Sequence, residues 1–113
     1  MTNFVNLTPH PITFVDCNDN AVLTVPTSGT VARVSATTMD DGSYVVEGNV
    51  IPVHIVVYGE VTGLPPYDET ANTAYLVSGM VAAAINRPDV LVPDEFVRDP
   101  DGKIIGARGV RRA

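Results

Sequence analysis

The chain has 113 residues and a mass of 12.0 kDa, which predicts a single domain over residues 1–113 with a modest core. Apolar residues make up 45% of the sequence, which is typical of a globular protein and excludes a disordered one. The formal net charge of −6 argues against binding to bulk nucleic acid, which requires a basic surface.

Short β-strands and polar turns alternate through the first half of the chain. Clusters of Pro, Gly, Asp, Asn and Ser predict turns at residues 8–11, 16–20, 26–29 and 40–42. The segments between them are rich in β-branched and aromatic residues and predict strands at residues 4–7, 12–15, 21–25, 30–36 and 44–46. Residues 50–58, VIPVHIVVY, are nearly all apolar or β-branched, so we expect them to form the most buried strand. Pro52 cannot donate to a ladder and predicts an edge, a strand start or a bulge.

The hydrophobic period changes from that of a strand to that of a helix within residues 73–87. Residues 75–77 predict a strand, Ser78 a helix cap, and residues 79–86 a short helix that Pro88 prevents from continuing. Near the C-terminus, Asp99-Pro100-Asp101-Gly102 is a strong turn signal between two apolar segments and predicts a hairpin. The sequence therefore predicts a mainly β (α+β) fold, a compact small β-barrel or sandwich of about eight short strands with one short helix.

The chain carries one cysteine, Cys17, which excludes an internal disulfide and a cysteine-built zinc site. The N-terminus lacks a basic stretch followed by an apolar core, and no segment approaches the roughly 20 apolar residues that a membrane span needs. We therefore expect a cytoplasmic protein without a membrane partner, and this includes the cytoplasm of an infected host cell.

Catalytic and metal-binding patterns are weak in this sequence. The two histidines, His10 and His54, lie far apart, and neither HxH nor HExxH occurs. Ser78 is not flanked by the GxSxG elbow of a hydrolase nucleophile. We expect no catalytic residue, no metal and no cofactor, and hence a protein that is not an enzyme.

Binding of a phosphate group has better physical support. Ser78 and Gly79 open the predicted helix, where free amides, the positive end of the helix dipole and a hydroxyl converge. Five of the seven basic residues fall in the last sixteen positions, and two of them, Arg98 and Arg108, lie on opposite strands of the predicted hairpin. These two guanidinium groups would neutralise the phosphate; alternatively, Arg98 pairs with Asp99 or Asp101 at the surface, or the basic tail only aids solubility.

Two further residues are candidates for ligand contact because prolines hold them rigidly. His10 lies between Pro9 and Pro11, and Tyr67 follows Pro65-Pro66 in a stiff loop. Tyr67 could stack on a base, or it could pack within the turn.

Four segments of the chain are NLTPHPI at residues 6–12, GLPP at 63–66, YLVSGMVAAAINRPDVLVP at 75–93 and VRDPDGKIIGARG at 97–109. Together they resemble a family of small proteins encoded by tailed phages and some bacteria, with a start like LTPHxI, a middle like YIVSxxVAxAxxR and an end like VRDxxGxIIGCRG. The resemblance covers nearly the whole chain, and its end is the most specific part. Ala107 stands where the family pattern often has cysteine, so no functional thiol is expected there.

The resemblance implies a phage or prophage setting. Compact phage proteins of this size without catalytic residues include anti-defence sponges, which sequester cyclic nucleotides or cyclic ADP-ribose isomers without cleaving them. By this analogy we expect a homo-oligomeric, non-enzymatic protein that captures a phosphate-bearing nucleotide immune signal in a pocket between subunits. Ser78 and Gly79 would hold the phosphate, Arg98 and Arg108 would neutralise it, and Tyr67, His10 and Asn6 would contact base or ribose. The alternatives are a virion or assembly protein whose basic tail docks on a partner, and an enzyme that degrades the same signals.

Overall fold

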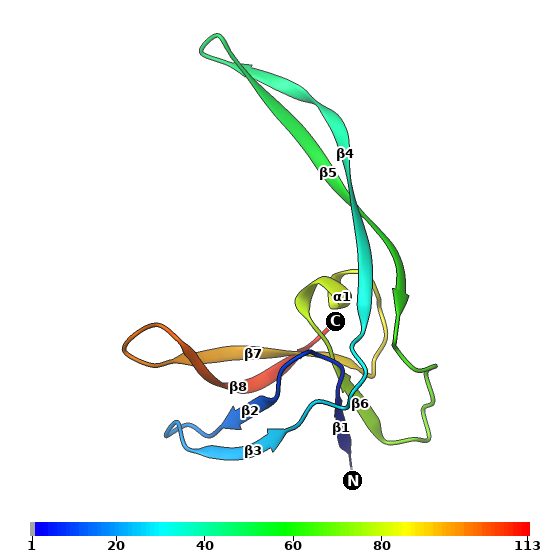
Figure 1. The fold of residues 1–113 in the computed structure, drawn as a ribbon, viewed down its shortest axis with the longest axis vertical. Coiled ribbons are helices and arrows are strands. Elements are labelled where there is room, and N and C mark those ends of the chain that lie inside the picture. The colour runs from blue at the N-terminus through cyan, green and yellow to red at the C-terminus, as the bar shows by residue number, and fades with distance from the viewer. Residues whose placement is uncertain (1) are drawn as a thin grey trace.

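The computed structural model describes residues 2–113, which form eight β-strands and one short α-helix (Figure 1). In chain order the elements are β1 (Asn3–Asn6), β2 (Ile12–Val15), β3 (Ala21–Val25), β4 (Arg33–Val46), β5 (Asn49–Thr62), β6 (Thr73–Leu76), α1 (Gly79–Ala83), β7 (Val90–Arg98) and β8 (Ile104–Arg112). The predicted mainly β fold of about eight strands with one short helix is confirmed.

Six of the strands form one mixed sheet in the order β1-β6-β7-β8-β2-β3. β1, β6 and β7 run parallel, and α1 makes the crossover from β6 to β7. β7 and β8 form an antiparallel hairpin, as do β2 and β3, while β2 joins β8 in parallel. β1, β6 and β7 therefore all begin at one edge of the sheet, the edge formed by strand ends, and β8 ends there.

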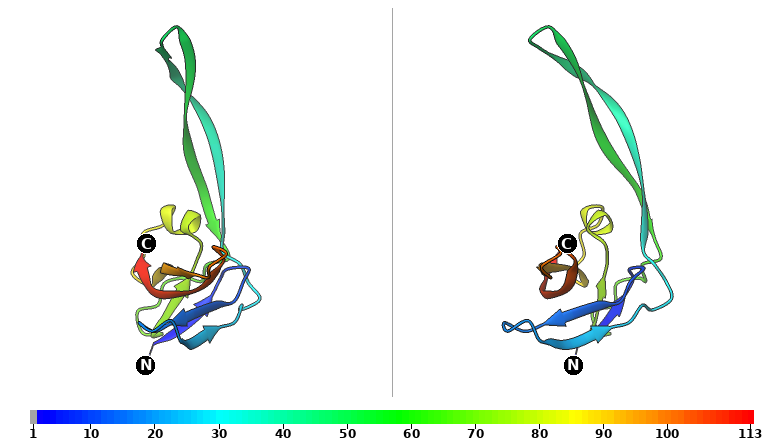
Figure 2. Two further views of the ribbon diagram at one scale, coloured as in Figure 1. Left: turned by 90° about the vertical axis from the view of Figure 1, so that its left-hand side faces the viewer. Right: turned by 60° about the vertical axis from the view of Figure 1, so that its left-hand side comes forward.

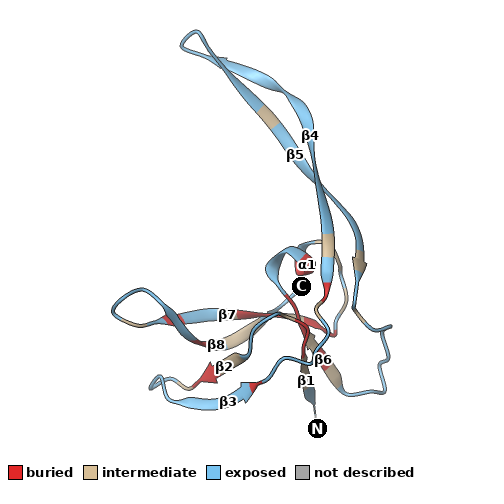
Figure 3. Cartoon of the chain, in the orientation of Figure 1, coloured by how far each residue is buried: buried red, intermediate tan, exposed pale blue. Residues whose placement is uncertain are grey.

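Apolar side chains cover both faces of the six-stranded sheet. Because successive strand residues point to opposite faces, Leu76 belongs to a cluster with Phe14 and Ala107, whereas the next residue, Val77, packs against Val81 of α1. Leu76 and Val77 are both fully buried. Figure 3 shows the buried residues concentrated in this body of the molecule.

The helix α1 is shorter than predicted. Ser78 caps it as expected, with its Oγ accepting from the Val81 amide at 3.4 Å, but the helix ends at Ala83 with Ala84 as its C-cap. The amides of Ala84 and Ile85 bond to the carbonyls of Val81 and Ala82, three residues back, which ends the α-helical pattern. Pro88 then disfavours helical geometry at Arg87. In residues 2–113 no helix has the length and apolar character needed to span a bilayer.

β4 and β5, with 14 residues each, form a two-stranded arm that projects from the body (Figures 1 and 2). Its base packs on the α1 side of the core through Val34 and Val61. The prediction of a turn at residues 40–42 was wrong, because β4 continues through this segment with a bulge between Asp40 and Ser43. Pro52 pairs with Ser43 beside that bulge, which agrees with one of the sites predicted for this proline.

The prediction that residues 50–58 form the most buried strand was also wrong. These residues lie in β5, where Val50, Ile51, Ile55 and Val56 are all exposed. No other strand of the described residues pairs with the arm. Consecutive residues along both strands are exposed, so both faces of the arm are largely open. Apolar composition identified the strand correctly but not its surroundings.

Candidate functional site

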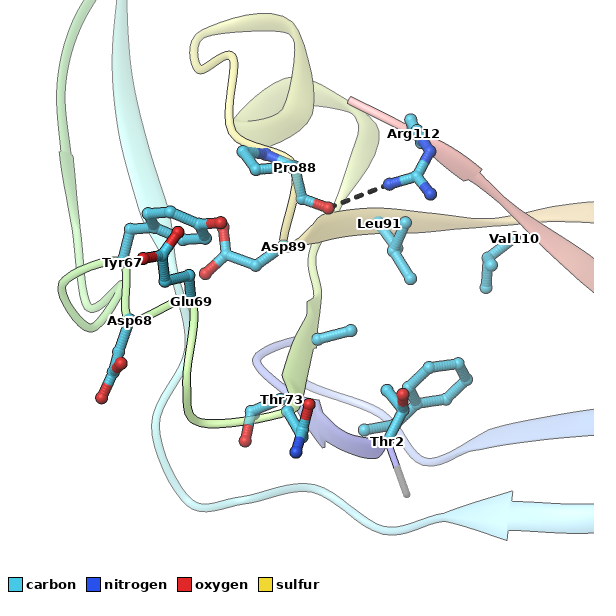
Figure 4. Close-up of a pocket in the computed structure, with 13 residues that line it drawn as sticks. Thr2, Tyr67, Asp68, Glu69, Thr73, Pro88, Asp89, Leu91, Val110 and Arg112 are labelled. Carbon is cyan, nitrogen blue, oxygen red and sulfur yellow. Dashed lines mark hydrogen bonds between the residues drawn. The ribbon is translucent and has the colours of Figure 1, made fainter.

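A cavity of about 410 Å³ lies at the sheet edge where β1, β6 and β7 begin and β8 ends (Figure 4). We call it the edge cavity. Its lining residues are Thr2, Phe4, Tyr67, Asp68, Glu69, Asn72, Thr73, Ala74, Pro88, Asp89, Leu91, Val110 and Arg112. Cavities that hold small organic ligands have volumes of roughly 300–1,000 Å³, so the edge cavity has room for such a molecule.

The lining of the edge cavity is apolar on the sheet side and polar at its rim. Phe4, Leu91 and Val110 come from β1, β7 and β8 and belong to the cluster around Leu76. The loop between β5 and β6 brings Tyr67 to one side, and Figure 4 shows Arg112 on the opposite side. An apolar wall with a few convergent polar groups is the usual composition of a small-molecule site.

Gly63 sets the path of the loop that carries Tyr67. Its φ of +81° favours glycine, and a Cβ at this position would lie 2.6 Å from the carbonyl oxygen of Val31. Only glycine therefore lets the chain leave β5 close to the backbone before β4. Pro65 and Pro66 then stiffen the segment that leads to Tyr67.

The guanidinium of Arg87 fastens this loop to the start of β7. Its Nε and one terminal nitrogen donate to the two carboxylate oxygens of Asp89 at 3.0 and 2.6 Å, and its other terminal nitrogen donates to the Pro65 carbonyl at 2.8 Å. The guanidinium carbon lies 5.8 Å from the centre of the Tyr67 ring, which is cation–π distance. Both charged side chains are largely buried, so Tyr67 is held by a fixed support while 48% of it stays exposed.

Asp68 is held by a tight turn next to Tyr67. Its carboxylate accepts from the Thr70 hydroxyl at 2.7 Å and from the Thr70 amide at 3.0 Å. The hydroxyl first, and then the amide, hold the pKa of Asp68 below its ordinary value of 3.8, because both donate to the charged form. This carboxylate therefore stays ionised to lower pH than an ordinary aspartate.

Arg112 supplies a cation to the rim of the edge cavity. It lies opposite Leu91 in the β7–β8 ladder, and one terminal nitrogen donates to the Pro88 carbonyl at 3.1 Å (Figure 4). Within residues 2–113 the ion pairs are Arg87 with Asp89 and Arg108 with Asp19, so Arg112 makes no ion pair with a described carboxylate. The guanidinium has five N–H donors and uses one of them on a neutral carbonyl, so the others are available to an anionic ligand.

The surroundings of Ser78 and Gly79 do not include Arg98 or Arg108. Ser78 lines a surface depression separate from the edge cavity, together with Leu7 and Val81. The cation beside Gly79 is Arg111, whose terminal nitrogen would lie 4.0 Å from a Cβ on that glycine. With only five residues, α1 has a single turn in which to develop a dipole.

Arg98 and Arg108 lie on the paired strands β7 and β8, as predicted, but each is engaged within the chain. Arg98 donates to the Gly102 carbonyl at 2.8 Å in the β7–β8 turn, rather than pairing with Asp99 or Asp101. Arg108 forms an ion pair with Asp19 of the β2–β3 turn. The two arginines thus stabilise the ends of two neighbouring hairpins.

Asn6 is 1% exposed, and its side chain is saturated with hydrogen bonds. Its Nδ2 donates to the carbonyls of His10 and Val25 at 2.8 and 3.2 Å, and its Oδ1 accepts from the amide and hydroxyl of Thr8 at 2.9 and 2.6 Å. All four bonds of the carboxamide are used. The NLTPH segment is therefore a structural clamp, and the His10 side chain lies exposed beside it.

Sequence reasoning selected Tyr67 but missed the other polar residues of the edge cavity. The sequence groups Arg112 with the basic tail, and its patterns give no binding role to Glu69 or Thr73. The parallel pairing of β1, β6 and β7 brings their first residues to one edge, and this pairing is not visible in the sequence. In residues 2–113 no group of three or more His, Cys, Asp or Glu side chains is placed to hold a metal ion.

Comparison of the chain with protein-family models, curated proteins and solved structures found no match.

Proposed function

We propose that the protein is a non-enzymatic binding protein that captures a phosphate-bearing nucleotide in the edge cavity. The observation that carries the proposal is the placement of an exposed tyrosine ring and an arginine without an ion-pair partner on opposite sides of one cavity. The Tyr67 ring would stack on the base, which is a sequence-tolerant contact. The Arg112 guanidinium would bind the phosphate.

The carboxylates at the rim fit the middle of such a ligand. Glu69 lies two positions after Tyr67 in the loop and lines the same cavity. Its carboxylate can accept hydrogen bonds that ribose hydroxyls donate. Thr73 adds a hydroxyl at the start of β6. Because these acidic groups repel a phosphate, they would favour one orientation of the nucleotide, with its phosphate toward Arg112.

The ionised state of Asp68 argues against one catalytic role of this residue, that of a general acid. A carboxyl group acting as a general acid near neutral pH needs a raised pKa, whereas the pKa of Asp68 is lowered. In the phage setting that the family resemblance implies, the captured molecule would be an immune signal, and its sequestration would block antiphage defence.

Calorimetric titration with a panel of nucleotides tests this function. Cyclic dinucleotides, cyclic trinucleotides and cyclic ADP-ribose isomers form the panel, with inorganic phosphate and adenosine as partial ligands. We expect saturable heat with at least one nucleotide, weaker binding of both partial ligands, and recovery of the nucleotide intact after heat denaturation of the protein. Absence of heat with every nucleotide, or recovery of a cleaved product, would contradict the proposal.

A further inference from the structure

The β4–β5 arm exposes more apolar surface than its own two strands can cover. Large apolar side chains along it are 39–71% exposed, namely Met39, Tyr44, Val45, Val46, Val50, Ile51, Ile55, Val56, Val57 and Tyr58. A hairpin of two strands is marginally stable in water without further packing. Contiguous exposed apolar surface on a folded protein marks an interaction site.

One face of the arm carries the bulkier apolar residues. Tyr44 pairs with Ile51, and Met39 pairs with Ile55, across the ladder. Directly paired residues place their side chains on the same face, and Val57 follows Ile55 by two positions. These five residues define what we call the apolar arm face. The Tyr44 and Ile55 side chains on it are 68% and 47% exposed.

The body carries an exposed apolar groove of complementary character on its β7–β8 hairpin. The groove has a volume of about 250 Å³ and includes Ile12, Phe96, Ile104 and Ile105 among its lining residues. Phe96, Ile104 and Ile105 are each about half exposed. We call it the β7–β8 groove, and Figure 1 shows this hairpin extending from the body well away from the arm of the same chain.

The charges of the two surfaces are opposite. The arm carries four carboxylates, Asp40, Asp41, Glu47 and Glu60, against one guanidinium, Arg33. The β7–β8 hairpin that contains the groove carries five cations, Arg98, Lys103, Arg108, Arg111 and Arg112, against four carboxylates, Asp94, Glu95, Asp99 and Asp101. Its net charge is therefore slightly positive, although Arg108 already pairs with Asp19 of the β2–β3 turn. Complementary charge at the border of an apolar contact sets the register and suppresses other partners.

From these observations we propose that the arm embraces a second copy of this chain, with its apolar arm face on the partner's β7–β8 groove. Each chain supplies one arm and one groove, so two copies can exchange arms reciprocally, and a symmetric pair is the smallest assembly that leaves no arm or groove unused. A stable interface takes about 20–30 residues from each partner, and the two strands of the arm hold 14 residues each. Apart from Arg112, the residues named for this contact lie outside the edge cavity, and the proposal needs no ligand there.

Sedimentation equilibrium of the full chain over a dilution series tests the exchange. We expect twice the chain mass of 12.0 kDa for the native protein and a fall to 12.0 kDa for the Tyr44→Asp/Ile55→Asp variant. Val22→Asp is the matched control, because Val22 is 64% exposed but lies on β3, outside the arm. Its mass should stay that of the native protein. A native protein that is monomeric at every concentration of the series would overturn the proposal, and a different protein would then be the partner of the arm.

Charge reversal keeps the test decisive if the aspartate variant fails to fold. Asp41→Lys and Lys103→Glu should each raise the dissociation constant of the assembly about two- to fivefold, as expected for pairs at an exposed border. The combination of both substitutions in one chain should bring the constant back toward the native value. Additive weakening in the combined variant, or no effect of either reversal, would overturn the arm-to-groove contact.

Discussion

Arg87 grips Asp89 through two parallel hydrogen bonds of 3.0 and 2.6 Å, and this pair ties the loop that carries Tyr67 to the start of β7. The third contact of the same guanidinium reaches the Pro65 carbonyl at 2.8 Å. The loop is thereby fixed before any ligand arrives, which lowers the entropic cost of binding.

Substitution of Arg87 should destabilise the fold and loosen the loop. Arg87→Ala leaves the largely buried Asp89 carboxylate without its partner, and we expect the free energy of unfolding to fall by about 1.5–3 kcal/mol, as for hydrogen bonds to charged groups. Urea denaturation measures this change. Arg98→Ala is the control, because Arg98 is exposed and makes one bond to a turn carbonyl. Equal losses in the two variants would contradict the clamp.

Asn6→Ala should destabilise the protein without changing its affinity for ligand. The substitution removes the donors that satisfy the carbonyls of His10 and Val25, and a buried group left unsatisfied costs about 1–3 kcal/mol. Thermal or urea unfolding measures the loss. Asn18→Ala, in the exposed β2–β3 turn, should be neutral. A stable Asn6→Ala variant with weakened ligand affinity would show that Asn6 contacts the ligand instead.

Thr70→Val should raise the pKa of Asp68 toward its ordinary value. The Thr70 hydroxyl is the main cause of the lowered pKa, and the backbone amide that remains should preserve part of the effect. Because the pKa is lowered in the folded state, the carboxylate contributes to stability above its ordinary pKa, and this contribution is lost as pH falls through the folded pKa. NMR titration of the Asp68 carboxyl carbon measures the pKa directly. An identical midpoint in the variant would exclude the hydroxyl as the cause.

Tyr67 and Arg112 should contribute different kinds of binding energy. Loss of base stacking in Tyr67→Ala should weaken nucleotide binding by about 1–3 kcal/mol, whereas Tyr67→Phe keeps the ring and should bind almost as the native protein does. Arg112→Ala should cost about 1.5–3 kcal/mol, and this term should shrink at high salt. Calorimetry of the three variants at two salt concentrations checks both. Full affinity in Tyr67→Ala would show that the base does not stack on Tyr67.

The local elements were predictable because local chemistry determines them. The β2–β3 hairpin follows from the Asp and Asn cluster at residues 16–20, the Ser78 cap from its side-chain oxygen, and the β7–β8 turn from Asp99 to Gly102. The end of α1 was not predictable, because the amides of Ala84 and Ile85 bond three residues back and end the helix at Ala83, well before Pro88 forbids its continuation.

The arm and the edge cavity were not predictable from local patterns. An apolar strand such as residues 50–58 has the same sequence pattern in a core and on a surface. Its composition does not reveal which neighbours cover it. The bulge at Asp40 to Ser43 carries the residue types of a turn, and only strand pairing distinguishes the two. Arg112 and Tyr67 meet at one cavity because distant strands share an edge, which is a property of sheet order.

The location of the bound nucleotide is the most direct test of the binding function. Backbone and side-chain NMR shifts should be followed while the tightest nucleotide of the panel is titrated into the native protein. We predict the largest changes at Tyr67, Thr73 and Arg112, with little change at Ser78, Arg98 and Arg108. Changes centred on Ser78 and the hairpin arginines, with Tyr67 and Arg112 unmoved, would contradict the edge cavity as the site.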